Sequence, residues 1–237
     1  QGMLYKYAEK VDEIYIYSAG CSSRELNKVV ENGLRSVFRK AKIHVDHDVL
    51  GAALAACQGK EGIACILGTG SNSCYYNGET IYEEIPSLAY ILGDEGSGSW
   101  YGKQVLRDYL YKEPIPEELR QELIDQGHDK TSILENIYMQ PHANVYLASF
   151  MKTISKFRET EYVDAMIHDG MRAFLDRHVC CFKNHKEVTT NFVGSIAYYF
   201  QDILKEEAEK LGITIGNVIK KPIDGLVEYH LKHPVQG

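Results

Sequence analysis

The sequence predicts an α/β protein in which helices connect the strands of a mostly parallel sheet. Residues 13–18, "EIYIYS", form a short segment rich in β-branched and aromatic residues, and a helical pattern follows it. Residues 42–47, "KIHVDH", predict a second strand, and residues 48–57 predict a second helix. Strand and helix in alternation favour parallel strands joined by right-handed connections.

The first helix is predicted to begin at Ser22 or Ser23, since either serine can cap it by accepting a hydrogen bond from a backbone N–H. The apolar residues that follow recur at helical spacing along one face of this helix. They are Leu26, Val29, Val30, Leu34, Val37 and Phe38. The second helix, "DVLGAALAAC", has small residues throughout, so we expect it to pack closely against another element.

From Gly62 onward the pattern changes to consecutive strands. The segments "IACILG", "SCYYNG" and "ETIYEE" follow one another, and Asn77-Gly78 is a strong hairpin pattern. A β-meander is therefore expected here. A helix over 100–111 comes next, and after two prolines the sequence stays mostly helical to about residue 182.

The end of the chain predicts one more strand, "TNFVG" at 190–194, and then a helix over 195–211. A short "ITIGNVI" run and a last helix after Pro222 complete the pattern.

Composition excludes several classes of function. The 237 residues are 44% hydrophobic, which is enough for one large domain or two modest ones with their own cores. The net charge is −7 and the basic residues are scattered, which argues against binding nucleic acid. No apolar run approaches the roughly 20 residues of a membrane span, and the start lacks the features of a secretion signal. We expect a cytoplasmic protein without nucleic-acid or membrane partners.

Neither the six cysteines nor the nine histidines have the spacing of metal ligands. The sequence contains no CxxC pair, so buried or incidental thiols are the favoured interpretation. His44 and His47 flank apolar Val45 near a strand end, whereas a zinc helix would need histidines at i and i+4 with a third ligand nearby. We therefore expect no metal held by protein side chains alone.

The run "ILGTGS" predicts a phosphate-binding turn. An apolar strand leads into Gly68, Thr69 and Gly70, whose backbone N–H groups could surround anionic oxygens while the threonine adds a hydroxyl. It is not the P-loop that opens a helix, because no lysine follows in that motif and the next residues predict a strand. An ordinary hairpin turn is the alternative.

A second glycine-rich run, "GDEGSGS", places Asp94 and Glu95 at the expected start of a helix. Capping of that helix by one carboxylate is the simple interpretation, because the helix dipole favours negative charge there. Two adjacent acids among glycines could also bind sugar hydroxyls or a hydrated Mg²⁺.

Asp46 and Asp48 lie where the second strand ends and the second helix begins. An aspartate at such a junction is often an N-cap. The same position is the carboxyl end of a strand, where ligands of α/β sheets bind, and a base there could take a proton from a sugar hydroxyl. The later "FVGSIAYYF" repeats the strand, glycine, helix order, so Gly194 could admit a flat ligand close to the backbone.

Taken together, "VDHDVLGAALA", "GIACILGTGSNSCYYNG", "LGDEGSGSWYGKQVL", "FVGSIAYYF" and "PIDGL" resemble the BadF/BadG/BcrA/BcrD ATPase family, and within it the N-acetylglucosamine kinases. The resemblance runs from about residue 13 to residue 230. The order LGTGSN and then GDEGS is specific, whereas either loop alone would be weak.

The resemblance implies an actin-like ATPase fold, of the ribonuclease H-like type, with two domains and a central cleft. The first domain would comprise residues 1–60 and about 220–237, and the second residues 61–219. ATP, Mg²⁺ bound mostly through water, and an amino sugar would occupy the cleft. Asp48 matches the catalytic aspartate that acts as general base on the sugar hydroxyl.

The resemblance also implies which residues line the ligand sites. These are the phosphate-binding residues Gly68, Thr69 and Gly70, the sugar-binding residues Asn72, Asp94 and Glu95, and the adenosine-side residues Gly194 and Ser195.

One departure concerns the first domain. The family begins with a strand and turn of the type DSGSTKTDW, which supplies a first phosphate loop, and this sequence contains nothing like it. We therefore expect a first domain without its N-terminal strands, and activity of these residues alone is in question.

Two alternatives to an amino-sugar kinase follow from the same residues. One is an ATPase activator of a dehydratase, which would use cysteines to hold an iron–sulfur cluster. The other is a truncated, non-catalytic module that binds sugar or nucleotide. A homodimer is the default expectation for the oligomeric state, because dimers are the commonest oligomers.

Overall fold

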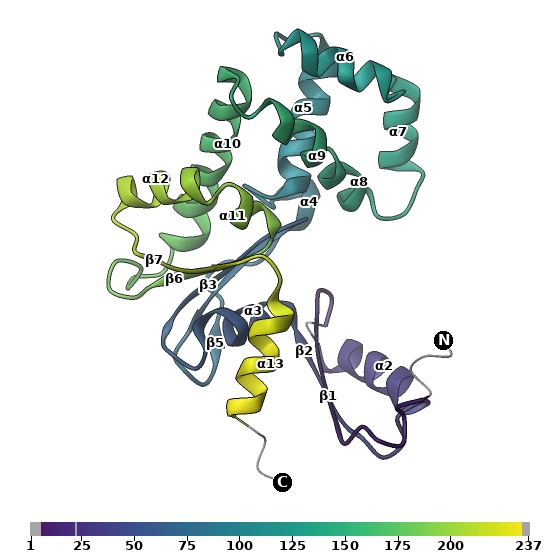
Figure 1. Ribbon diagram of the computed structural model, residues 1–237, viewed down its shortest axis with the longest axis vertical. Coiled ribbons are helices and arrows are strands. Elements are labelled where there is room, and N and C mark those ends of the chain that lie inside the picture. Colours follow the sequence, from purple (N-terminus) through teal and green to yellow (C-terminus); the bar gives the residue numbers. More distant parts are fainter. Residues whose placement is uncertain (1–5, 22, 234–237) are drawn as a thin grey trace.

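The computed structural model describes residues 6–21 and 23–233 (Figure 1). Its strands are β1 Glu13–Ser18, β2 Lys42–His47, β3 Gly62–Leu67, β4 Ser71–Tyr76, β5 Ile81–Tyr82, β6 Thr190–Val193 and β7 Ile215–Ile219. Its helices are α2 Arg24–Arg35, α3 Asp48–Cys57, α4 Ala89–Leu92, α5 Gly98–Tyr111, α6 Glu117–Asp125, α7 Lys130–Tyr138, α8 Ala143–Ser149, α9 Met151–Ile154, α10 Glu161–Phe174, α11 Ser195–Tyr199, α12 Gln201–Leu211 and α13 Pro222–Lys232. A 3₁₀ turn, η1 Ser155–Phe157, follows α9, and a π-helical turn, η2 Leu175–Val179, follows α10.

Five strands form the larger sheet, in the order β5-β4-β3-β6-β7. β3, β6 and β7 run parallel, whereas β4 and β5 are antiparallel to their neighbours. A three-residue turn joins β3 to β4, and so short a connection permits only an antiparallel pair. The predicted meander is thus confirmed, and the carboxyl ends of three parallel strands meet at one edge of the sheet.

The first two strands form a separate parallel pair in register from Glu13 opposite Lys42 to Ser18 opposite His47. α2 connects them, as the sequence predicted. Ser23 caps this helix by accepting a hydrogen bond from the backbone N–H of Leu26. Ser22, the other predicted cap, lies outside the described residues.

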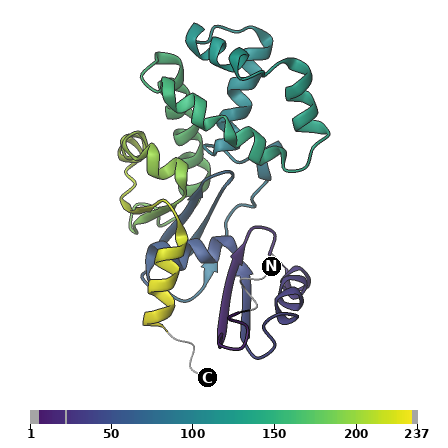
Figure 2. The ribbon, with the colours of Figure 1, turned by 45° about the vertical axis from the view of Figure 1, so that its right-hand side comes forward.

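Helix α3 joins the two sheets. Eight of its ten residues are buried, and it packs against β3, β4 and β6 on one side and against β1 and α13 on the other. Figure 2 shows α3 with the larger sheet on one side and with α13 and the β1–β2 strands on the other. Its small residues permit this, because a Cβ on Gly51 would lie 2.5 Å from the Cβ of Tyr17 in β1. The close packing predicted for this helix is confirmed.

The main core lies between the larger sheet and the helices α5 to α12 (Figure 1). Tyr101 of α5, Phe174 of α10 and Phe192 of β6 are fully buried there. The tyrosine hydroxyl is satisfied by the carbonyl oxygen of Ile167 at 3.0 Å. This core fixes the sheet edge where β3 and β6 end.

One element prediction needed correction, and one unassigned run forms a strand. The expected helix over 195–211 is interrupted at Phe200, whose backbone leaves the helical region, and it forms α11 and α12. The "ITIGNVI" run, for which no element was assigned, contributes the edge strand β7. No helix of residues 6–21 and 23–233 is long and apolar enough to cross a membrane.

Candidate active site

The turn at residues 68–70 is held by the start of α5. The carbonyl oxygens of Gly68 and Thr69 accept hydrogen bonds from the backbone N–H groups of Gly98 and Ser99, at 2.8 and 3.0 Å. The amide of Gly68 donates to the carbonyl of Gly70 at 3.0 Å. The amides of Thr69 and Gly70 have no acceptor within the described part of the chain, so they remain able to bind an anion.

Gly194 stands directly beside this turn. A Cβ at this position would lie 2.1 Å from the carbonyl oxygen of Leu67. The backbone φ of Gly194 is +132°, a conformation that residues with a side chain rarely adopt. Its N–H donates to Ile219 at the end of β7, at 2.9 Å. Ser195 then begins α11. The structure therefore brings the predicted phosphate turn and the predicted adenosine-side loop together at the ends of β3, β6 and β7.

These two loops form one end of a cavity of about 630 Å³, which we call the glycine-lined cavity. Its other walls come from the start of α5, from α8, α9 and the η1 turn, and from α11 with the Phe200 that follows it. Its lining comprises Gly68, Thr69, Gly98, Ala148, Ser149, Met151, Lys152, Ser155, Arg158, Ser195, Ile196, Tyr199 and Phe200. The charged members are both cations and the rest are small, hydroxylic or apolar. Such a lining suits a ligand with an anionic end and a flat, less polar body.

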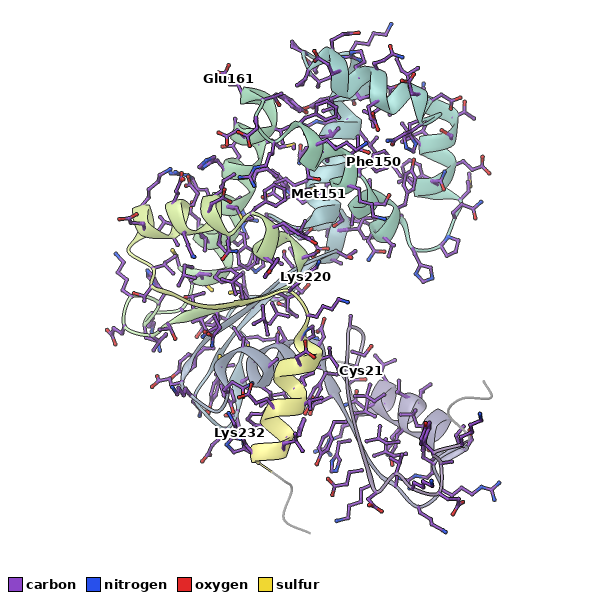
Figure 3. All side chains as sticks on the ribbon, in the orientation of Figure 1. Cys21, Phe150, Met151, Glu161, Lys220 and Lys232 are labelled. Carbon is purple, nitrogen blue, oxygen red and sulfur yellow. The ribbon has the colours of Figure 1, made fainter. Side chains whose placement is uncertain are left out.

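A second cavity, of about 690 Å³, lies where β2 ends, and we call it the polar cavity. Its lining comprises Cys21, Ser23, Arg24, Asn27, Asp46, His47, Asn72, Ile81, Glu83, Pro86 and Ser87. Figure 3 labels Cys21, in the polar cavity, and Met151, in the glycine-lined cavity. Amide, carboxylate and hydroxyl groups dominate the lining, which suits a ligand rich in hydroxyl groups.

Asn72 belongs to the polar cavity and follows the phosphate turn by two residues. Its side chain is 8% exposed, and its Oδ1 accepts a hydrogen bond from the N–H of Ser73 at 2.8 Å. Its Nδ2 has no hydrogen-bond partner in residues 6–21 and 23–233. Because Asn72 lines the polar cavity, this free N–H₂ group can donate to an acceptor on a ligand.

Asp48 is the first residue of α3, and its side chain is 31% exposed. Its Oδ1 lies 3.3 Å from Nε2 of His47, and Nδ1 of that histidine lies 3.6 Å from Oε1 of Glu83. His47 and Glu83 line the polar cavity, so Asp48 connects to it through the histidine ring. Capping does not explain the two aspartates. His47 is the N-cap without a side-chain bond, and Asp46 accepts from the N–H of His47.

Asp94 and Glu95 lie behind the phosphate turn. Asp94 is 7% exposed, and its Oδ1 accepts from the N–H of Ser71 at 3.2 Å. Burial raises the pKa of Asp94, and the hydrogen bond from Ser71 opposes this rise. The capping interpretation was wrong, because Ser97 caps α5 by accepting from Trp100. Neither carboxylate is among the residues that line the polar cavity, so their sugar contact stays a prediction.

Sequence reasoning missed the partners of Glu95. Its carboxylate accepts from Arg177 at 2.8 Å and lies 3.3 Å from Nε2 of His178. Both residues belong to the π-helical turn η2, a rare element found often at functional sites. His178 is buried, which lowers its pKa, while Glu95 opposes the shift. No periodicity in the sequence distinguishes a π-helical turn from an α-helix, so this contact was not predictable.

The described cysteines and acids show no resident metal or cluster site. All six cysteines are free, and burial raises the pKa of Cys57 to about 12. Within the described residues, no three His, Cys, Asp or Glu side chains are grouped so as to hold a metal ion.

Known proteins with the same architecture decide the family. No family model matches the chain. A crystal structure from Porphyromonas gingivalis, of a protein assigned by name as an N-acetylglucosamine kinase, matches 97% of this chain and 81% of its own length, with 35% identity and a TM-score of 0.91. The chain belongs to a sugar kinase family. Over 109 residues it is also 32% identical to the N-acetylmuramic acid/N-acetylglucosamine kinase of Clostridium acetobutylicum.

The two other comparisons carry less weight for this sugar kinase family member. The match to the Clostridium kinase covers 46% of this chain and spans only 36% of that kinase. A Chromobacterium violaceum structure, also assigned by name as an N-acetylglucosamine kinase, is 20% identical with a TM-score of 0.66 over 90% of this chain and 75% of its own. At that identity it supports the α/β fold alone.

Proposed function

We propose that this sugar kinase family member transfers the γ-phosphate of ATP to a hydroxyl of an amino sugar, with N-acetylglucosamine as the first candidate. We also propose the BadF/BadG/BcrA/BcrD ATPases as its wider family and the cytoplasm, where ATP is available, as its location. The observation that carries this proposal is the pair of adjacent cavities with complementary chemistry. Thr69 lines one and Asn72 the other, and three residues of chain span at most about 10 Å.

The glycine-lined cavity would hold the nucleotide. The free amides of Thr69 and Gly70 would donate to phosphate oxygens, and Lys152 would add positive charge. Gly194 and Ser195 would lie on the adenosine side, because Ser195 lines this cavity and Gly194 directly precedes it. Fixed donors of this kind stabilise charge that develops during phosphoryl transfer.

The polar cavity would hold the sugar, with the unpartnered amide of Asn72 donating to one of its oxygens. We propose that Asp48 accepts the proton from the attacking hydroxyl. A bond then forms between the sugar oxygen and the γ-phosphorus, the bond to the β-phosphate oxygen breaks, and ADP leaves. His47 lies within 3.3 Å of the Asp48 carboxylate and would orient it. Positioning of this kind provides most of the rate in phosphoryl transfer.

Mg²⁺ fits this arrangement as a companion of ATP. A magnesium ion keeps several waters and binds mainly through substrate phosphates, so it needs no dedicated cage of protein ligands. When bound, it would neutralise charge on the phosphate oxygens. The residues closest to those oxygens would be the turn 68–70 and, behind it, Asp94.

The division of the chain into residues 1–60 with about 220–237, and residues 61–219, remains our proposal for its domains. The chain leaves α3 through Gln58 and Gly59, both at positive φ, and it leaves β7 through Lys220. These two connections between the proposed domains would serve as the hinge about which the domains close over the bound ligands.

The proposal is tested by measuring ADP release with ATP and Mg²⁺ against a panel of sugars. The panel should contain N-acetylglucosamine, glucose and N-acetylmuramic acid, and the protein should be the full-length gene product. Release of ADP that depends on an amino sugar is the expected result. Binding of ATP without sugar-dependent ADP release for any sugar would overturn it.

A further inference from the structure

The polar cavity carries a cation that a neutral amino sugar does not need. Arg24 lines this cavity and is exposed, and its guanidinium makes no ion pair or hydrogen bond with the rest of residues 6–21 and 23–233. An arginine in such a cavity therefore has its donors free for a ligand.

The stability of α2 does not account for this residue. Arg24 is the first residue of the helix, directly after the cap Ser23. The helix dipole disfavours a cation in the first turn and favours an acid there, as Glu25 illustrates. Arg24 is thus placed against the preference of its own helix.

The two carboxylates of the cavity both contact His47. On the β2 side, Asp46 accepts from the N–H of His47 at 2.8 Å, and Glu83 lies 3.6 Å from the ring of the same histidine. These carboxylates already have partners, whereas Arg24, on the α2 side, has none among the described residues. The buried Asn72, with its free amide donor, lines the same space. Asn72 can therefore donate to a hydroxyl group of a ligand while Arg24 donates to an anionic group of the same ligand.

We propose that Arg24 is a specificity-determining residue that binds a carboxylate on the substrate. The polar cavity then accepts an amino sugar with a carboxylate-bearing substituent, the chemistry of N-acetylmuramic acid. This inference rests on the proposed function. A guanidinium binds a carboxylate through two parallel hydrogen bonds, which gives direction as well as affinity. The volume of about 690 Å³ leaves room for the substituent beside the sugar ring.

The test compares N-acetylmuramic acid with N-acetylglucosamine in the wild type and in Arg24→Gln, Arg24→Lys and Lys28→Gln. Lys28 lies one turn further along α2 and lines a neighbouring cavity but not the polar cavity, so it is the matched control. In Arg24→Gln the ratio of kcat/KM for N-acetylmuramic acid to that for N-acetylglucosamine should fall about tenfold or more. Arg24→Lys should restore part of it, and Lys28→Gln should keep the wild-type ratio.

Direct binding of both sugars, measured by calorimetry, separates this inference from the proposed function. If neither sugar is phosphorylated but N-acetylmuramic acid binds the wild type and binds Arg24→Gln about tenfold more weakly, the kinase proposal fails and the carboxylate site stands. A wild type that phosphorylates or binds N-acetylglucosamine but not N-acetylmuramic acid would overturn the inference. An unchanged ratio or affinity in Arg24→Gln would do the same, as would binding of neither sugar.

Discussion

The glycine-lined cavity and the polar cavity differ in how the chain builds them. The first depends on backbone, because Gly68 and Thr69 line it and a side chain on the adjacent Gly194 would collide with Leu67. The second depends on side chains from four separate elements, among them Asn72, His47 and Arg24. The contrast teaches that an anion can be bound by amides at one sheet edge, whereas hydroxyl recognition needs side chains brought from distant parts of the chain.

Asp48→Asn tests the point where the two cavities act together, and it should have the largest effect. Removal of a general base lowers kcat by about 10²–10⁴-fold. ATP affinity should stay near the wild-type value, because Asp48 does not line the glycine-lined cavity. Steady-state kinetics and nucleotide titration measure both quantities. Asp46→Asn should lose far less, and retained turnover in Asp48→Asn would remove this residue from the role of base.

Gly194→Ala tests the glycine-lined cavity, whose end is built from backbone. The added Cβ would lie 2.1 Å from Leu67 at a φ of +132°, so β3 and β6 would have to separate. We expect a loss of about 3 kcal/mol or more in the free energy of unfolding, measured by urea denaturation. Gly33→Ala is the control, since Gly33 is exposed on α2 with nothing within 4 Å of the new atom. Equal stability of the two variants would contradict the close approach.

Asn72→Ala tests the polar cavity by itself. Loss of the free amide donor should raise the KM for the sugar about tenfold or more, while the KM for ATP stays unchanged. Asn136→Ala is the comparison, because Asn136 lies on α7 and lines neither cavity. A rise in both Michaelis constants would mean that the two cavities do not divide the ligands in this way.

Lys152→Gln makes the corresponding test in the glycine-lined cavity. Lys152 is exposed, so its attraction to phosphate is screened by water, and the KM for ATP should rise only about two- to fivefold. The KM for the sugar should not change. Lys156→Gln provides the control, because the Lys156 ammonium is paired with Glu122 and does not line the cavity. An equal rise of the KM for ATP in both variants would mean that the net charge of the protein matters and that Lys152 does not contact the phosphates.

The smallest effect concerns the support behind the turn that separates the cavities. Burial lowers the pKa of His178 below the ordinary value of about 6.5, so the folded state binds fewer protons than the unfolded state. The stability that the neutral His178 contributes is fully present above the ordinary histidine pKa, and it is lost as the pH falls through the lowered pKa. Between pH 7 and about 5, the free energy of unfolding of His178→Gln should therefore fall by less than that of the wild type. His142→Asn, at an exposed position, should follow the wild type.

Much of the fold followed from the sequence because its patterns are local. The strands at 13–18, 42–47 and 62–67, the hairpin at Asn77-Gly78 and the tight helix 48–57 all depend on nearby residues. The break at Phe200 and the π-helical turn were not predictable, because packing in the main core decides them and local spacing does not.

The sequence by itself determined where this chain turns and which residue types stand at the turns. It therefore indicated the turn 68–70, Asp48 at a strand end and Gly194 after a strand. Only the tertiary structure decided that Gly194 presses against Leu67 and that Glu95 is held by Arg177 and His178. It also decided that Arg24 faces the same cavity as Asn72. The physical reason is range: a turn depends on the φ and ψ of a few neighbours, whereas a cavity depends on contacts between segments far apart in the chain.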